Sequence, residues 1–250
     1  MPIKLINADK TMKIALLISG GGTTAAEIIL AARSGQLNGI EPALVVASRA
    51  GTLGIERAAE AGMLKNSIVV MQPGNFENEK VFGEAIIKEC ETRGVEFIGQ
   101  YGWMGKTPQN VIERFQGMMV NQHPGPLDPC RPDFGGTGMY GRRVHAARLY
   151  FVRRTNRDFW TEATAQRVAV RYDEGAVLKR KKVLILPDDD VASLQERVLP
   201  VEYEVQIETL RDFAAGEVKE LKRETPLILP GEEEILEEAK EAAMLLFPRG

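Results

Sequence analysis

Hydrophobic positions in the first half of the chain form short continuous runs, and segments with helical spacing separate them. The runs that we expect to be strands are residues 13–18, 42–48, 67–70, 95–99 and 117–121. The intervening helices are expected at residues 25–34, 54–61 and 77–93, and from Thr107 and Pro108 onward. Continuous apolar runs are typical of strands buried on both faces. The alternation predicts an α/β fold with a mostly parallel, doubly wound sheet and helices on both of its faces.

The second half of the chain is less regular. Residues 124–141 are rich in glycine and proline and predict a loop, which a short helix over residues 142–152 follows. Residues 165–170 and 176–185 predict two strands, joined by a turn at residues 172–175. A helix is expected over residues 191–213. From residue 217 the composition shifts towards charge, and residues 231–247 predict an acidic amphipathic helix.

Composition excludes several classes of protein. The 250 residues carry 32 Lys and Arg against 35 Asp and Glu, a formal charge of −3, which argues against a general nucleic-acid binder. No apolar run approaches the roughly 20 residues of a membrane helix, and the first residues lack the apolar core of a signal peptide. Two cysteines and two histidines offer neither a disulfide framework nor a His-rich metal site. We therefore expect a cytoplasmic protein that uses no metal and binds neither nucleic acid nor membrane.

A glycine run, Ser19 to Thr24, follows the first expected strand and leads into a helix. Glycines let the backbone turn tightly and approach a ligand, and the N-terminus of the following helix favours a phosphate. The run is neither a Walker A loop nor the pattern GxGxxG, because no Gly-Lys-Ser follows and position 25 is alanine. A tight turn that binds no ligand remains the alternative.

Two polar residues, Asn121 and His123, end the fifth expected strand, just before Pro124. If the strand continues, the two side chains project from the same face. They would then lie where open α/β sheets bind ligands. An amide beside an imidazole can stabilise a carbonyl oxygen that becomes negative during attack. A hydrogen-bonded turn before the proline is an equal alternative.

Asp173 lies in the expected turn, and Asp and Gly are common turn residues. A carboxylate placed near His123 could instead raise the pKa of the imidazole and assist proton transfer. The sequence alone does not bring these two residues together.

The motifs SGGGTT, GIERAAEAG, GWM-x-x-TP, VNQHPGPL, GGTGMYGRRVHAA, YDEGA and VEYE occur in this order between residues 13 and 213. Together they resemble the glycinamide ribonucleotide formyltransferases of purine synthesis. The resemblance implies a Rossmann-like formyltransferase fold. It also implies transfer of a formyl group from 10-formyltetrahydrofolate, as co-substrate, to the amine of glycinamide ribonucleotide. The expected partners are these small molecules, and the protein is expected to be a monomer or a homodimer.

The resemblance also implies roles for particular residues. Asn121 and His123 would stabilise the tetrahedral oxyanion, and Asp173 would orient His123 and assist proton removal from the amine. The other implied positions bind substrates. They are Gly21, Gly22, Thr23 and Thr24 for the phosphate, Glu202 for the ribose, and Trp103, Met104, Ala169, Val170, Arg171 and Tyr172 for the folate. The domain would then cover residues 12–216, with a phosphate-binding half over 12–112 and a catalytic and folate half over 113–216. A tail, 1–11, would precede it and an acidic helical extension, 217–250, would follow.

Several positions depart from the family pattern SGNGSN, NIHPS and MRILSP. The chain has Gly21, Thr23 and Thr24 in the first, Gln122 in the second, and a shortened stretch at residues 105–107 in place of the third. Gln166 replaces a common histidine. The region 150–162 contains three arginines, for which the alternatives are a solvated face or contact with an anionic substrate or folate tail.

Three functions remain open from the sequence. The first is formyl transfer to glycinamide ribonucleotide or to another amine. The second is hydrolysis of 10-formyltetrahydrofolate with the same three residues, and the third is non-catalytic binding of a nucleotide or folate. An intact phosphate loop and Glu202 favour the transferase, because a hydrolase needs no ribonucleotide site.

Overall fold

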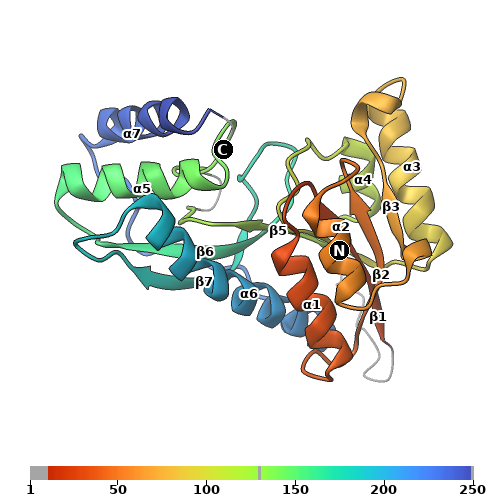
Figure 1. Cartoon of the computed structure of the whole chain (residues 1–250). Coiled ribbons are helices and arrows are strands. Elements are labelled where there is room, and N and C mark those ends of the chain that lie inside the picture. Colours follow the sequence, from red (N-terminus) through yellow and green to blue (C-terminus); the bar gives the residue numbers. More distant parts are fainter. Residues whose placement is uncertain (1–10, 129–130, 249–250) are drawn as a thin grey trace. The chain divides into compact units, whose positions relative to one another are not determined.

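The structure is a computed structural model that describes residues 11–128 and 131–248. The chain divides into two compact units (Figure 1). The first comprises Met1–Asn121 with Gln206–Val218, and the second comprises Gln122–Val205 with Lys219–Gly250.

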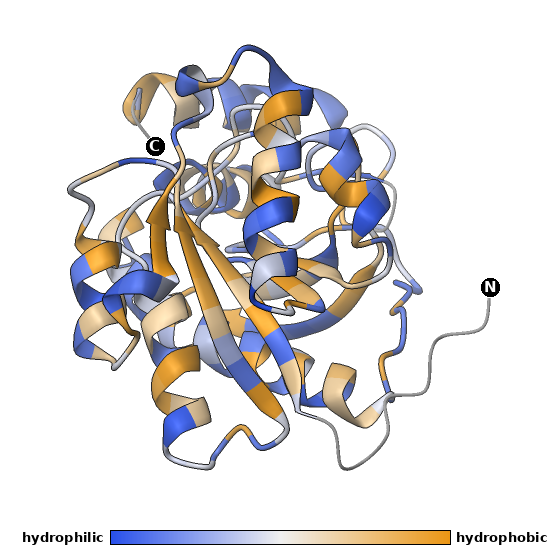
Figure 2. Ribbon diagram, turned by 90° about the vertical axis from the view of Figure 1, so that its right-hand side faces the viewer, coloured by the Kyte–Doolittle hydropathy of each residue, from blue (hydrophilic) through white to orange (hydrophobic). Residues whose placement is uncertain are grey.

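The first unit contains the parallel strands that the hydrophobic runs predicted. They are β1 (Met12–Ile18), β2 (Ile40–Ala47), β3 (Ile68–Val70), β4 (Phe97–Gln100) and the start of β5 (Met119–His123). Strand β1 pairs in parallel with β2 and β4, β2 with β3, and β4 with β5. Residues of β1 and β4 are almost wholly buried, as continuous apolar runs imply. Figure 2 shows the strands coloured mainly as hydrophobic.

The helices of this unit lie between the strands in sequence. They are α1 (Thr23–Arg33), α2 (Leu53–Glu60), α3 (Glu79–Thr92) and α4 (Gln109–Arg114), with short 3-10 turns η1 (Lys65–Ser67) and η2 (Pro73–Asn75). Helix α4 begins one residue later than expected, because Pro108 is its N-cap and not its first residue. The strand order reverses between β1 and β4, which is the switch point where open α/β sheets bind ligands.

The whole sheet has the order β3-β2-β1-β4-β5-β6-β7, and its last pair, β6 (Trp160–Arg167) and β7 (Val177–Leu184), is antiparallel. This confirms a mostly parallel sheet. The expected strand 165–170 was misplaced, because β6 begins at Trp160 and residues 168–170 follow it as loop. The prediction failed because the start of β6 buries a charged side chain. Glu162 is fully buried in β6 and forms an ion pair with Arg223, so the start of the strand has no apolar pattern.

The second unit holds α5 (Arg142–Thr155) and α7 (Glu233–Leu246), which run alongside one another (Figure 1). Helix α6 (Val191–Ala215) begins in this unit and continues into the first. A buried cluster joins α5, α7 and the loop before α5. In residues 11–128 and 131–248, no helix is long and apolar enough to cross a membrane.

Candidate active site

The glycine run follows β1 and provides the turn into α1. Gly22 has a φ of 62° and forms the N-cap of that helix. A Cβ at Gly22 would lie 2.6 Å from the Cα of Gly54, so the close approach of α1 and α2 requires glycine there. Gly20 has no neighbouring atom within 4 Å of its Cβ position. Gly22 therefore serves the fold, and Gly20 leaves the loop backbone open on one side.

Polar contacts fix the shape of the glycine run. Arg57 donates to the Gly21 carbonyl at 2.7 Å, and Arg49 donates to the Ser19 carbonyl at 3.0 Å. Thr23 and Thr24 begin α1, where the first backbone N–H groups have no intrahelical partner. Two guanidinium groups and a helix N-terminus give the loop a positive character that suits an anion.

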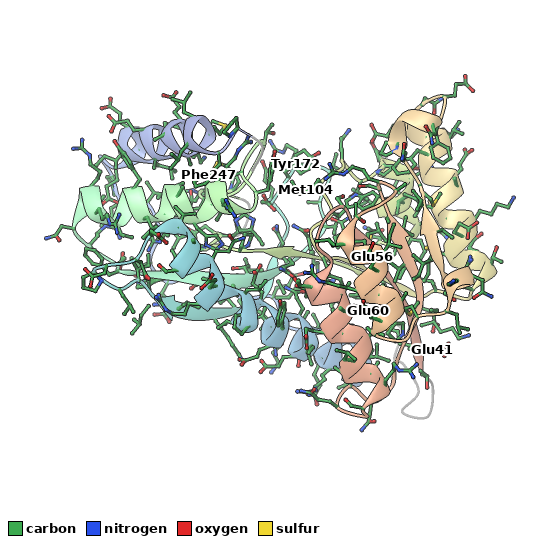
Figure 3. The ribbon with its side chains drawn as sticks, viewed as in Figure 1. Glu41, Glu56, Glu60, Met104, Tyr172 and Phe247 are labelled. Carbon is green, nitrogen blue, oxygen red and sulfur yellow. The ribbon has the colours of Figure 1, made fainter. Side chains whose placement is uncertain are left out.

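The two residues after β4 that are predicted to bind the folate differ in exposure. Trp103 is 7% exposed and stacks on Phe82, with ring centroids 6.4 Å apart. Met104, which is labelled in Figure 3, is 41% exposed, and its backbone N–H donates to Ser19 Oγ at 2.9 Å. The structure thus brings this loop and the glycine run together at the switch point. Trp103 supports the loop from within the core, and Met104 presents side-chain surface.

Strand β5 ends at His123, so Asn121 and His123 project from the same face of one strand. The strand therefore continues through both residues, as the proposed pairing of the Asn121 amide with the His123 imidazole requires. Asn121 is half-buried, and His123 is 2% exposed. Both side chains lie at the carboxyl end of a parallel strand.

The His123 imidazole donates a hydrogen bond to the backbone carbonyl of Phe134. Its Nε2 has no hydrogen-bond partner among the described residues, so Nδ1 makes that bond. The nearer Asp173 oxygen, Oδ2, lies 3.7 Å from Nδ1. Burial lowers the pKa of His123 below 6.5, and Asp173 and the Phe134 carbonyl oppose that shift. The neutral imidazole therefore presents a lone pair at Nε2.

The Asp173 carboxylate is held from two sides. Gly136 N–H donates to Oδ2 at 2.9 Å, and Gln166 Nε2 donates to Oδ1 at 2.6 Å. Asp173 lies in the turn between β6 and β7 with a φ of 58°, a conformation that Asp tolerates better than most residues. Asp173 therefore lies in a turn, as predicted, and also close to His123.

The loop before Asp173 is open to solvent. Val170 is 53% exposed and Tyr172 is 43% exposed. Arg171 forms an ion pair with Glu174 at 2.7 Å. With Ala169, these residues form the loop that follows the end of β6. Val170 and Tyr172 therefore present side-chain surface to solvent before Asp173.

Glu202, the residue implied for the ribose, lies on α6 and is 5% exposed. Gln122 Nε2 donates to its Oε1 at 2.6 Å. Burial raises the pKa of Glu202 to about 7, and the hydrogen bond from Gln122 acts in the opposite direction. Gln122, one of the departures from the family pattern, is therefore bonded to another candidate site residue.

Comparison with known proteins fits this geometry. A family model described as "Formyl transferase" matches residues 12–210. The chain belongs to the formyl transferase family. It is 28% identical to the phosphoribosylglycinamide formyltransferase of Haemophilus influenzae over 207 residues, which are 83% of this chain and 89% of that protein. It is 30% identical to a trifunctional purine biosynthetic protein of Drosophila pseudoobscura over 86% of this chain, but spans only 15% of that protein.

A solved structure supports the same assignment. Glycinamide ribonucleotide transformylase 1 from Symbiobacterium toebii superposes with a TM-score of 0.73 at 25% identity, over 89% of this chain and 99% of that chain. The formyltransferase fold predicted from the motifs is confirmed.

The sequence did not predict which backbone groups contact His123 and Asp173, or that Gln166 donates a hydrogen bond to Asp173. The Phe134 carbonyl and the Gly136 N–H contact the catalytic candidates, and no side-chain pattern marks them. The glycines of GGTG were a usable signal, because a Cβ at Gly135 would lie 2.7 Å from the Cβ of Asp173. Gln166 was noted only as the loss of a histidine, yet it donates to Asp173.

The three arginines of the region 150–162 interact with carboxylate or carbonyl groups of the protein itself. Arg153 donates to the Asp189 carbonyl at 2.5 Å, and Arg154 lies 3.8 Å from Glu238. Arg157 forms ion pairs with Asp158 and Glu232. Neither alternative describes them fully, because they connect α5 and its following loop to neighbouring segments of the second unit.

Proposed function

We propose that this formyltransferase transfers a formyl group from 10-formyltetrahydrofolate to the amine of glycinamide ribonucleotide, a step of purine biosynthesis. One observation carries the proposal. At the end of β5, the buried His123 holds a lone pair on Nε2 and faces Asp173 through Nδ1, with Asn121 two residues earlier. The names of the relatives support the choice of acceptor.

The imidazole is suited to move one proton. As the amine attacks the formyl carbon, Nε2 of neutral His123 accepts the proton that the amine loses. Asp173, close to Nδ1, stabilises the imidazolium that forms. His123 then donates the proton to the folate nitrogen as the bond between that nitrogen and the formyl carbon breaks. The proton is thus conserved and the imidazole returns to its neutral state.

The Asn121 amide supplies a donor for the oxyanion that develops on the formyl oxygen. An amide that is already positioned needs little reorganisation when the charge develops.

Substrate binding follows from the remaining candidates. We assign the phosphate to the backbone from Gly21 to Thr24, and the ribose hydroxyls to Glu202. The folate is assigned to Trp103 and Met104, and to the exposed loop over residues 169–172. The positive character of the first loop and the exposure of the last support these assignments.

The test is an assay of the purified protein with 10-formyltetrahydrofolate, with and without glycinamide ribonucleotide. We expect His123→Ala and Asp173→Asn each to lower kcat by roughly 10²-fold or more. Asp188→Asn is the control, because that carboxylate is exposed and is not one of the candidate site residues, and we expect it to be fully active. Wild-type turnover in either site variant would remove that residue from the mechanism.

The same assay separates the alternatives. A hydrolase would release formate from the folate at an undiminished rate without ribonucleotide. A binding protein would bind the folate but neither transfer nor release the formyl group. Only the transferase consumes the two substrates in equal amounts.

A further inference from the structure

The extension beyond the matched family region packs against the part of the fold that carries the catalytic candidates. The family match ends at residue 210, and α7 (Glu233–Leu246) lies beyond it. Helix α7 runs alongside α5 in the second unit (Figure 1). Its residues Leu236, Ala239 and Ala243 are buried in one cluster with Phe134 and Met139 of the loop before α5.

One side chain joins the end of α7 to that loop. Arg143 is 9% exposed, and its Nε and Nη2 donate to the carbonyls of Phe247 and Pro248 at 2.7 and 2.8 Å. Its Nη1 donates to the Gly138 carbonyl at 2.7 Å. Phe247 lies at the end of α7 (Figure 3). A single guanidinium therefore fixes the loop and the chain end to each other.

A second contact adds to this clamp. Met244 Sδ lies 3.2 Å from the Cβ position of Gly138, whose φ is +82°. The loop thus meets α7 closely at a residue that must be glycine for conformational reasons. The extension therefore meets the loop through the apolar side chain of Met244 and through the Arg143 side chain of α5, which binds both segments.

The same loop positions both titratable members of the catalytic set. The Phe134 carbonyl accepts the hydrogen bond from His123, and the Gly136 N–H donates to Asp173. Phe134 is itself fully buried in the cluster that α7 completes. A displacement of this loop therefore changes the relative placement of Nδ1 and Oδ2, which are now 3.7 Å apart.

We infer that residues 219–248 are a positioning element of the active site, which fixes the loop over residues 134–141 and through it the His123–Asp173 pair. Arg143 is the positioning residue that links the two. The inference rests on the proposed function, because it assigns the extension to the same catalytic pair. The extension acts through this loop, so we expect it to affect the rate of the chemical step and not substrate binding.

The decisive variant is Arg143→Met, which keeps much of the side-chain length and removes all three hydrogen bonds. Arg154→Met is its matched control, because Arg154 also connects α5 to α7, through Glu238, but makes no contact with the loop. We expect Arg143→Met to lower kcat by about 10-fold or more, since small misplacements of catalytic groups have effects of this size. The KM for 10-formyltetrahydrofolate should stay within about twofold, and Arg154→Met should retain wild-type kcat.

A second pair of variants covers the possibility that Arg143→Met does not fold. Met244→Ala removes the contact with Gly138, and Leu245→Ala is its control on the same helix, at a side chain that is 83% exposed. The expected order of kcat is Leu245→Ala equal to wild type, with Met244→Ala lower.

NMR of the imidazole groups provides a readout that does not depend on turnover. The chain has only two histidines, so the His123 resonances can be assigned with one His145→Gln variant. If the extension positions the pair, the His123 resonances and pKa differ between Arg143→Met and wild type and agree between Arg154→Met and wild type. A folded Arg143→Met protein with wild-type kcat and unchanged His123 resonances would overturn the inference. Absence of formyl transfer in the wild type would instead overturn the proposed function.

Discussion

Replacement of Glu202 by glutamine should make the protein more stable at high pH and leave its stability at low pH almost unchanged. The carboxyl group is 5% exposed, and the hydrogen bond from Gln122 partly offsets the cost of burying its charge. Burial raises the pKa of Glu202 from 4.5 to about 7 in the folded protein. At about 1.4 kcal/mol for each pKa unit, the ionised group lowers the free energy of unfolding by about 3 kcal/mol.

The sign follows from proton uptake. Between pH 4.5 and 7 the folded protein binds this proton more tightly than the unfolded chain does, so stability falls as the pH rises. The cost is absent below pH 4.5 and complete above pH 7. Glutamine has no charge to bury at any pH, and its amide oxygen can still accept the hydrogen bond from Gln122.

The assay is urea unfolding of the wild type and Glu202→Gln at pH 4.5, 6 and 8, followed by tryptophan fluorescence. The difference in free energy of unfolding should grow from near zero at pH 4.5 to about 3 kcal/mol at pH 8. Glu204→Gln is the control on the same helix, because that side chain is 61% exposed and pairs with Lys181. A difference that is the same at pH 4.5 and pH 8 would refute the reasoning.

Three further predictions concern the site and its loop. When kcat/KM is measured over pH 4.5 to 9, its acid limb should have a midpoint below pH 6.5. The reason is that the neutral imidazole of His123 is the required form and burial lowers its pKa. A midpoint above pH 6.5 would contradict this. Gln166→Met should lower kcat about 10-fold with little change in folding, because it removes the 2.6 Å hydrogen bond to Asp173, and steady-state kinetics with circular dichroism check both parts. Gly22→Ala should destabilise the protein by roughly 1–3 kcal/mol or more, because of its positive φ and the 2.6 Å approach to Gly54, whereas Gly20→Ala has room and should unfold like the wild type in urea.

The proposed ribose role of Glu202 would carry a cost in the stability of the fold. Above its raised pKa of about 7, this buried carboxyl is ionised and lowers the free energy of unfolding. Perturbed groups of this kind concentrate at functional sites, where the interaction they make with a ligand offsets their cost. Stabilisation by Glu202→Gln together with weaker ribonucleotide binding is therefore the combined outcome that the proposed ribose role requires.

The elements of the first unit could be predicted because each is specified by its own segment. Strand β1 is a continuous apolar run, and α3 is followed by Gly94, whose φ of 68° ends the helix. Strand β6 could not be placed in this way. Glu162 is buried there only because Arg223, far along the chain, neutralises it, and no local pattern records such a partner.

The same distinction divides the site. The spacing of Asn121 and His123 on one strand depends only on the local period of two residues, so the sequence could predict that they share a face. The contact between Gln166 and Asp173 depends on an irregularity in the pairing of β6 with β7, which falls between Ala165 and Gln166. Bulges of this kind turn a side chain towards a site, and they arise from the pairing of two strands and not from either strand alone.

The extension shows where a correct local prediction stops short of function. The pattern over residues 231–247 predicted an amphipathic helix, and α7 is that helix. An apolar stripe specifies that a helix packs, but not against what. The structure shows that α7 packs beside the loop before α5. Arg143 donates to both Gly138 and Phe247, which lie 109 positions apart in the sequence. Because the loop at Gly138 also carries the groups that contact His123 and Asp173, the packing of α7 and the placement of these two side chains involve the same segment.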